Sequence, residues 1–162
     1  MKIVGFKAND ALRLGVVDGD AVIDLQAADP GVPNDLGEVL RRNNGDLSGI
    51  ADLARRAPAS ARRPLAGLTF GFPVARPGKI ICLGLNYLDH VKEGPQKDNI
   101  PKFQSIFFRV QTSLTPHLQP LMRPKKSIQL DYEAEMVVVI GKRAKHLTMD
   151  NATDCGAGYT CD

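Results

Sequence analysis

The pattern of apolar and polar positions divides the chain into a first part of short alternating runs and a second part of longer apolar runs. Residues 2–6, 12–17 and 21–25 are three short β-prone runs, and the Asp-Gly step within 18–20 supports a tight turn between the last two. We therefore expect the chain to begin with a meander of three antiparallel strands.

Two short helices are predicted after these strands. Apolar side chains recur at helical spacing in 34–42, where Asn34 or Asp35 can cap the helix, and again in 45–57. Residues 58–79 are rich in proline and glycine, which predicts a linker with one short strand near residues 68–72. We expect a domain boundary in the last part of this linker.

The second part of the chain reads as strands joined by long loops. The continuous apolar run 79–85 predicts a strand that is buried on both faces. Residues 105–110 and 129–141 are further predicted strands, whereas 111–127 is a polar, proline-rich loop. Residues 148–160 indicate the start of a helix followed by a glycine-rich turn. The fold class expected for the whole chain is α+β, with a small antiparallel-strand and helix domain at 1–73 and a β-rich domain at 74–162.

Composition narrows the classes of function. A hydrophobic fraction of 43% is sufficient for a packed core. The net charge of +3 and the 6% aromatic content, without a run of basic residues, argue against nucleic-acid binding. The three cysteines have no disulfide or zinc spacing, and neither a signal peptide nor a membrane span is visible. We expect a cytoplasmic protein with no membrane partner.

Three carboxylates stand at alternate positions at the start of the predicted strand 129–141, namely Asp131, Glu133 and Glu135. Alternate residues of a strand share a face. A rise of about 3.3 Å per residue sets them about 6–7 Å apart. Like charges beside a buried strand favour a hard divalent cation such as Mg²⁺, Mn²⁺ or Ca²⁺. The alternative is the solvent-facing end of an edge strand, where alternation only marks the wet side.

Three blocks of sequence resemble the fumarylacetoacetate hydrolase family, in its bacterial form with a small N-terminal domain. The blocks are "KIICLGLNYLDHVKEG", "FFRVQTSL" and "LDYEAEMVVVIGKRAKHLTMDNATDCGAGYT", and they occur in the family's order. The resemblance implies that the second domain is a mixed β-sandwich roll, which is incomplete in this chain.

The resemblance also implies a chemistry for individual residues. Glu133 and Glu135 match the family's Glu-x-Glu pair, which holds Mg²⁺ or Mn²⁺, and Ca²⁺ is a further possibility for these oxygen ligands. His90 and Glu93 match a dyad that activates water or moves a proton, and Arg109 is a candidate for binding a substrate carboxylate. Taken from the residues alone, His90 and Arg109 are also compatible with ordinary surface positions.

The substrates that the resemblance implies are small diketo or 2-oxo acids, as in aromatic catabolism. Family members hydrolyse C–C bonds, decarboxylate or isomerise such acids, and they commonly form homodimers. By the family's register, the third metal ligand would fall about two positions beyond Asp162, or at Asp162 itself in a shortened turn, so the resemblance assigns two of the three ligands, Glu133 and Glu135. We therefore expect weak metal binding. The alternative function is a non-catalytic fragment or assembly module that pairs with another chain.

Overall fold

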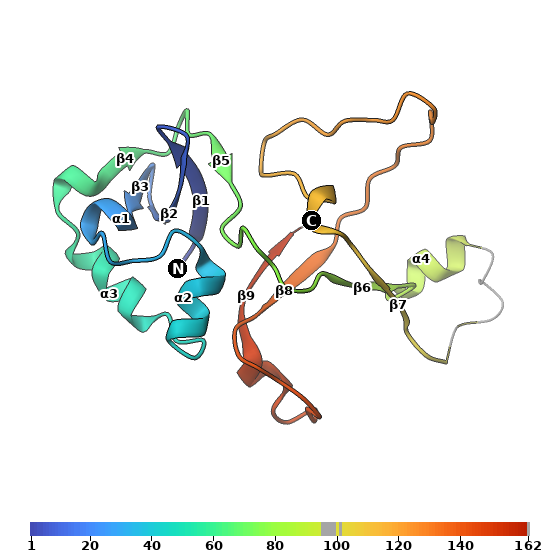
Figure 1. The fold of residues 1–162 in the computed structure, drawn as a ribbon. Coiled ribbons are helices and arrows are strands. Elements are labelled where there is room, and N and C mark those ends of the chain that lie inside the picture. Colours follow the sequence, from blue (N-terminus) through green and yellow to red (C-terminus); the bar gives the residue numbers. More distant parts are fainter. Residues whose placement is uncertain (95–99, 101, 162) are drawn as a thin grey trace. The chain divides into compact units, whose positions relative to one another are not determined.

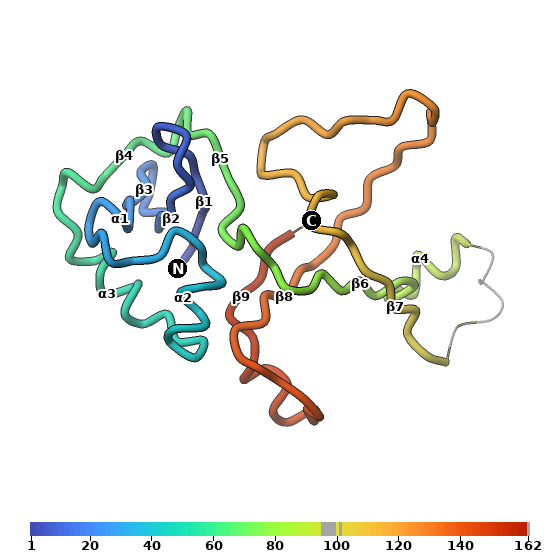
Figure 2. The backbone as a smooth tube through the Cα atoms, in the orientation of Figure 1, coloured from blue at the N-terminus to red at the C-terminus, as the bar shows by residue number. Residues whose placement is uncertain are grey.

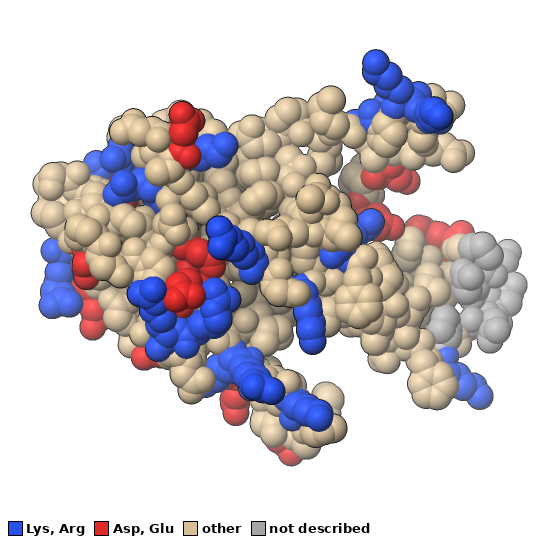
Figure 3. All heavy atoms as spheres, viewed as in Figure 1, with Lys and Arg blue, Asp and Glu red and all other residues tan. Residues whose placement is uncertain are grey.

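A computed structural model describes residues 1–94, 100 and 102–161 of the chain (Figure 1). These residues form an α+β structure in which every strand pair is antiparallel, and this confirms the predicted fold class at that level. None of the helices in these ranges is long and apolar enough to cross a membrane. Both basic and acidic side chains lie on the face of the molecule that Figure 3 shows.

The chain groups into two compact units, which are described one at a time. The first unit combines Met1–Ala75 with Thr115–Asp162, and the second is Arg76–Leu114, so the backbone leaves the first unit and returns to it (Figure 2). The predicted domains 1–73 and 74–162 remain a prediction.

The first unit contains a five-stranded antiparallel sheet with the strand order β4-β3-β2-β1-β5. Its strands are β1 (Ile3–Ala8), β2 (Ala11–Asp18), β3 (Ala21–Asp24), β4 (Arg62–Pro64) and β5 (Phe70–Gly71). The predicted meander is confirmed, and Gly19 has the positive φ of 62° that the tight turn between β2 and β3 requires. The predicted short strand near 68–72 is confirmed as β5. The sequence did not predict β4.

Helical segments lie between β3 and β4 in the chain, and the two predicted within 34–42 and 45–57 are confirmed. They are α1 (Leu25–Ala28), α2 (Leu36–Arg42), α3 (Ser48–Arg56) and the 3₁₀ helix η1 (Ala59–Ala61). Of the two candidate caps for α2, Asp35 is the one used, and its carboxylate accepts a hydrogen bond of 2.9 Å from the Glu38 N–H.

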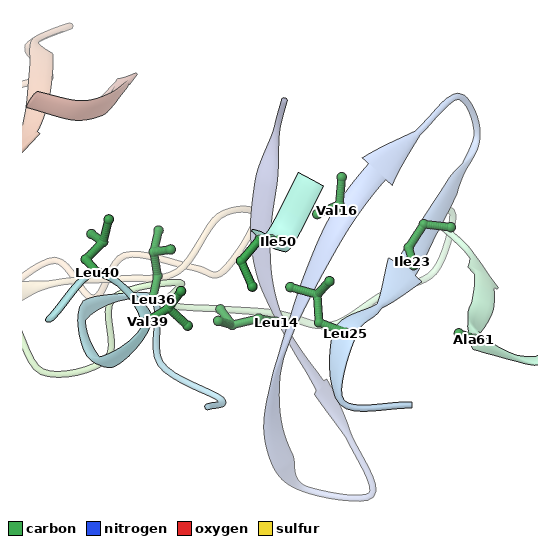
Figure 4. Packing of buried hydrophobic residues seen from close by; sticks show 9 residues of the cluster. All are labelled: Leu14, Val16, Ile23, Leu25, Leu36, Val39, Leu40, Ile50 and Ala61. Atoms are coloured by element: carbon green, nitrogen blue, oxygen red, sulfur yellow. The ribbon is translucent and has the colours of Figure 1, made fainter. Parts of the chain in front are cut away.

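One hydrophobic core lies between this sheet and these helices (Figure 4). Its buried members are Leu14, Val16, Ile23, Leu25, Leu36, Val39, Leu40, Ile50 and Ala61. The apolar residues of α2 that recur at helical spacing all belong to this core. Their packing explains why so short a helix is stable here.

The first unit also contains a two-stranded antiparallel sheet made of β8 (Met136–Ile140) and β9 (Gly156–Cys161), with the 3₁₀ helix η3 (Ala152–Cys155) before β9. Of the predicted strand 129–141, the described pairing covers Met136–Ile140, and Met136 lies opposite Cys161, the last described residue of β9. The prediction of a glycine-rich turn near the end of 148–160 is wrong, because the residues from Gly156 onward form β9 and pair with β8.

The second unit contains β6 (Ile81–Gly84) paired with β7 (Ser105–Phe108), the helix α4 (Leu88–Glu93) and the 3₁₀ helix η2 (Gln111–Ser113). Antiparallel partners share a face. The pairs Ile81 with Phe108 and Leu83 with Ile106 therefore form one apolar face. All four side chains are exposed, Ile81 to 55%. The prediction that the first of these strands is buried on both faces is wrong for the described residues.

Candidate metal and catalytic residues

The segment 131–135 runs without regular secondary structure directly into β8. Glu133 is exposed and Glu135 is half-buried. In β8, Val137 and Val139 are also half-buried, while their neighbours in the strand are exposed. Glu135 is the next alternate residue before Val137, so it lies on the same, more buried face. The pair is therefore arranged with one carboxylate in water and one at the margin of a packed surface.

Asp131 differs from the two glutamates in its local bonding. Its carboxylate accepts a hydrogen bond of 2.9 Å from the N–H of the next residue, Tyr132, and its side chain is exposed. An oxygen that is committed to a local turn is less available to a cation. This bond agrees with leaving Asp131 outside the predicted ligand pair.

His90 and Glu93 lie three residues apart on α4, which places both on one side of the helix. Both side chains are exposed, and no hydrogen bond joins them among the described residues. The pair at this spacing that does form is Asp89 with Lys92, at 3.0 Å. Asp89 stands in the first turn of α4, and the N-cap residue of this helix is Tyr87.

Arg109 follows the last residue of β7 in the second unit. Its backbone N–H donates a hydrogen bond of 3.1 Å to the carbonyl of Ile80, which extends the β6–β7 pairing. Its guanidinium carbon lies 5.4 Å from the centre of the Phe107 ring, within the range of a cation–π contact. This contact holds the charged end on the strand surface, where it is exposed to solvent.

The turn between β6 and α4 carries a feature that the sequence did not predict. Leu85 has a φ of 57°, in the left-handed region that a branched side chain enters only with strain. Such strain is often found beside functional residues. Leucine gives no turn signal, so nothing in the sequence could have identified this position.

The donor set can be compared with what a divalent cation needs. Glu133 and Glu135 offer the carboxylate oxygens that Mg²⁺ and Mn²⁺ prefer. Within the described ranges, however, no three His, Cys, Asp or Glu side chains come together as a metal site. The predicted position of a third ligand, Asp162, lies outside the described residues. The pair thus fits a hard cation in chemistry and is incomplete in number.

The sequence profile described as "Fumarylacetoacetate (FAA) hydrolase C-terminal" matches residues 79–161, about half of the chain. The chain therefore belongs to the fumarylacetoacetate hydrolase family. The matched range contains all five predicted site residues: His90, Glu93, Arg109, Glu133 and Glu135. Their individual roles remain predictions.

Curated relatives and solved structures agree with this membership. The human protein named mitochondrial oxaloacetate tautomerase FAHD2A is 36% identical over 99% of this chain and 51% of its own length. The Dictyostelium discoideum homolog of fumarylacetoacetate hydrolase domain-containing protein 2 is also 36% identical, over 91% of this chain and 48% of its own length. This chain spans about half the length of the curated relatives it matches.

Two solved structures have similar folds at 28% identity and a TM-score of 0.73 each. One is a fumarylacetoacetate hydrolase from Exiguobacterium antarcticum, matched over 99% of this chain and 54% of the other. The second is a maleylpyruvate hydrolase from Sphingobium, in complex with manganese(II) and pyruvate, matched over 99% of this chain and 57% of the other.

Proposed function

We propose that this chain carries part of the active site of a divalent-metal-dependent enzyme that acts on small diketo or 2-oxo acids. The observation that carries the proposal is the family match over residues 79–161, which includes the Glu-x-Glu pair at 133 and 135. The relatives named as an oxaloacetate tautomerase and a maleylpyruvate hydrolase support a small oxo acid as substrate. The reaction is a C–C hydrolysis, a decarboxylation or an isomerisation.

Each residue has a proposed role. Glu133 and Glu135 hold Mg²⁺ or Mn²⁺, which when bound supplies a Lewis acid for the 2-oxo-acid group. His90 transfers a proton, because imidazole is the side chain that exchanges protons most readily near neutral pH. Glu93, on the same side of α4, orients the imidazole, and Arg109 binds a substrate carboxylate through its forked N–H donors.

A second function is favoured by two specific observations. The described residues provide no three-donor metal group, and both two-stranded sheets expose an apolar face. These features suit a non-catalytic assembly module that pairs with another chain. We also expect the catalytic protein to be a homodimer. Association with another chain is therefore common to both functions, and catalytic turnover distinguishes them.

The test measures Mn²⁺ binding by calorimetry and turnover of an acylpyruvate in the presence of Mg²⁺. The variants are Glu133→Ala and His90→Ala, each with a matched control. Asp131→Ala removes an exposed carboxylate two residues away. His117→Ala removes an exposed imidazole whose ring lies 4.9 Å from the ring of Phe70.

Glu133→Ala should abolish Mn²⁺ uptake, whereas Asp131→Ala should preserve it. His90→Ala should abolish turnover and keep Mn²⁺ binding, and His117→Ala should change neither. We expect the wild-type chain to bind Mn²⁺ with a dissociation constant above the micromolar range, because two carboxylates alone hold such ions weakly. Turnover that both test variants leave unchanged would rule out the catalytic proposal.

A further inference from the structure

The sheet formed by β8 and β9 shares the hydrophobic core of the first unit. Val139 of β8 and Ala157 of β9 are half-buried and pack against the core cluster. Val138, which points to the other face, is 44% exposed. One face of this small sheet is therefore fixed on the core and the other is open to solvent.

A β-bulge directs Ala157 toward that core. Val139 pairs with Gly158 and Ile140 pairs with Gly156, so Ala157 is the extra residue between two ladder pairs. A Cβ atom at Gly141 would lie 2.8 Å from the Cβ of Ala157, closer than side chains pack. Glycine at 141 is thus required for the close approach that seats the bulge.

The turn between α2 and α3 makes a second contact with the same end of β8. Gly45 has a φ of 84°, and a Cβ atom there would lie 2.8 Å from Cγ of Lys142 and 3.2 Å from the carbonyl oxygen of Gly141. The N–H and hydroxyl of Ser48 lower the pKa of Asp46 most strongly, and the charge of Lys142 lowers it further. The turn and the strand end are therefore close in both shape and charge.

We propose that Val139, Ala157 and Gly45 are positioning residues for Glu135. Glu135 and Val139 have the same parity along the chain, and the strand between them is paired from Met136 onward. Fixing Val139 in the core fixes the direction in which the chain enters β8, and that direction determines where the Glu135 carboxylate points. The N-terminal helices would then support the metal ligand pair through this core contact, as outer residues commonly support ligands. The metal part of this inference rests on the proposed function.

The test compares two neighbouring valines of one strand in the full chain. Val139→Ala removes a side chain from the core, and Val138→Ala removes the same atoms from the exposed face. Hydrogen exchange of the backbone N–H groups of residues 135–137 reports order without any metal. Mn²⁺ titration followed by electron paramagnetic resonance reports affinity. Urea unfolding confirms that each variant is folded at the temperature used.

Val139→Ala should speed hydrogen exchange at 135–137 and weaken Mn²⁺ binding about tenfold, the size of effect seen for supporting residues around metals. Val138→Ala should change neither, and Val139→Ile, which keeps a branched apolar side chain in the core, should leave both close to their wild-type values. A lower stability in Val139→Ala with unchanged exchange and unchanged Mn²⁺ affinity would mean that Val139 only stabilises the fold, and would overturn the inference.

A pair of glycines gives an independent comparison. Gly45→Ala and Gly67→Ala both place a side chain at a positive φ, 84° and 80°, but Gly67 has no atom within 4 Å of the new Cβ. Only Gly45→Ala should therefore speed exchange at 135–137, and equal effects of the two would overturn the inference. A wild-type chain that takes up no Mn²⁺ at millimolar concentration would refute the proposed metal site instead, and the exchange comparison would then decide the positioning role alone.

Discussion

Replacing Asp24 with alanine should destabilise the protein by about 3 kcal/mol or more, because its buried carboxylate joins three parts of the first unit. The side chain is fully buried. Its oxygens accept hydrogen bonds of 2.9 Å from Nε of Arg13 and 2.9 Å from Nε of Arg63, and one of 3.1 Å from the N–H of Ala27. Strands β2 and β4 and the start of α1 are thereby tied to the end of β3.

The magnitude follows from these contacts. Breaking a buried ion pair by removing one partner costs about 3–5 kcal/mol, and the loss of a helix N-cap costs about 1 kcal/mol. The Arg63 side chain is 45% exposed, so water recovers part of its solvation and the lower end of the range applies. Against a total stability of about 5–15 kcal/mol, this loss is large enough to measure without difficulty.

Urea unfolding of the full chain, followed by circular dichroism, measures the change in the free energy of unfolding. Asp18→Ala is the matched control, because Asp18 pairs with the neighbouring Arg62 at 2.8 Å while its side chain is 61% exposed. That exposed pair should contribute about 1 kcal/mol or less. Equal losses in Asp24→Ala and Asp18→Ala would refute the reasoning that burial, and not pairing, sets the cost. Asp24→Asn should fall between them, since it keeps an acceptor and loses the charge.

Three further predictions concern a cap, an acid transition and an open face. Asp35→Ala removes the acceptor of the Glu38 N–H and of the Ala75 N–H, and should cost about 1–2 kcal/mol in urea unfolding, with Asp35→Asn costing less. The pKa of Asp46 is lowered in the folded protein, so its contribution to stability is complete above the ordinary carboxyl pKa of about 4 and is lost as the pH falls through the lowered value. Asp46→Asn should therefore make thermal stability less dependent on pH in that acidic range. Ile81→Lys should cost less than about 1 kcal/mol, since the side chain is 55% exposed, and a larger loss would contradict an open face on β6.

The elements that the sequence predicts well are those whose signals are local. The Asp-Gly turn at Gly19, a cap at Asn34 or Asp35 and the helical spacing of α2 each act within a few residues, and the structure contains all three, with Asp35 as the cap. Their apolar faces then meet in a single core made mostly from the first 61 residues. Local preference and tertiary packing agree in this region, so the pattern alone is sufficient.

Pairing partners decide two outcomes that the sequence pattern alone does not. The run 129–141 alternates as far as Glu135 and is then continuously apolar, and among the described residues only Met136–Ile140 has a pairing partner. Conversely, the glycines of β9 suggest a turn, although the segment pairs with β8 through its backbone, which every residue except proline can do. Periodicity describes which face a side chain would take and leaves open whether a partner strand is present.

For the glutamate pair too, the sequence period predicts the face on which a side chain lies, and packing decides how firmly it is held. The period of two correctly places Glu135 in register with Val137 and Val139, and Val139 is the residue that reaches the core. Glu133, two residues further from that core, is exposed, whereas Glu135 is half-buried. A metal site built on this pair should therefore be firm at Glu135 and loose at Glu133. Glu133→Asp, which shortens the looser ligand, should consequently weaken Mn²⁺ binding less than Glu135→Asp, and the opposite order in a Mn²⁺ titration would contradict this account of how the pair is supported.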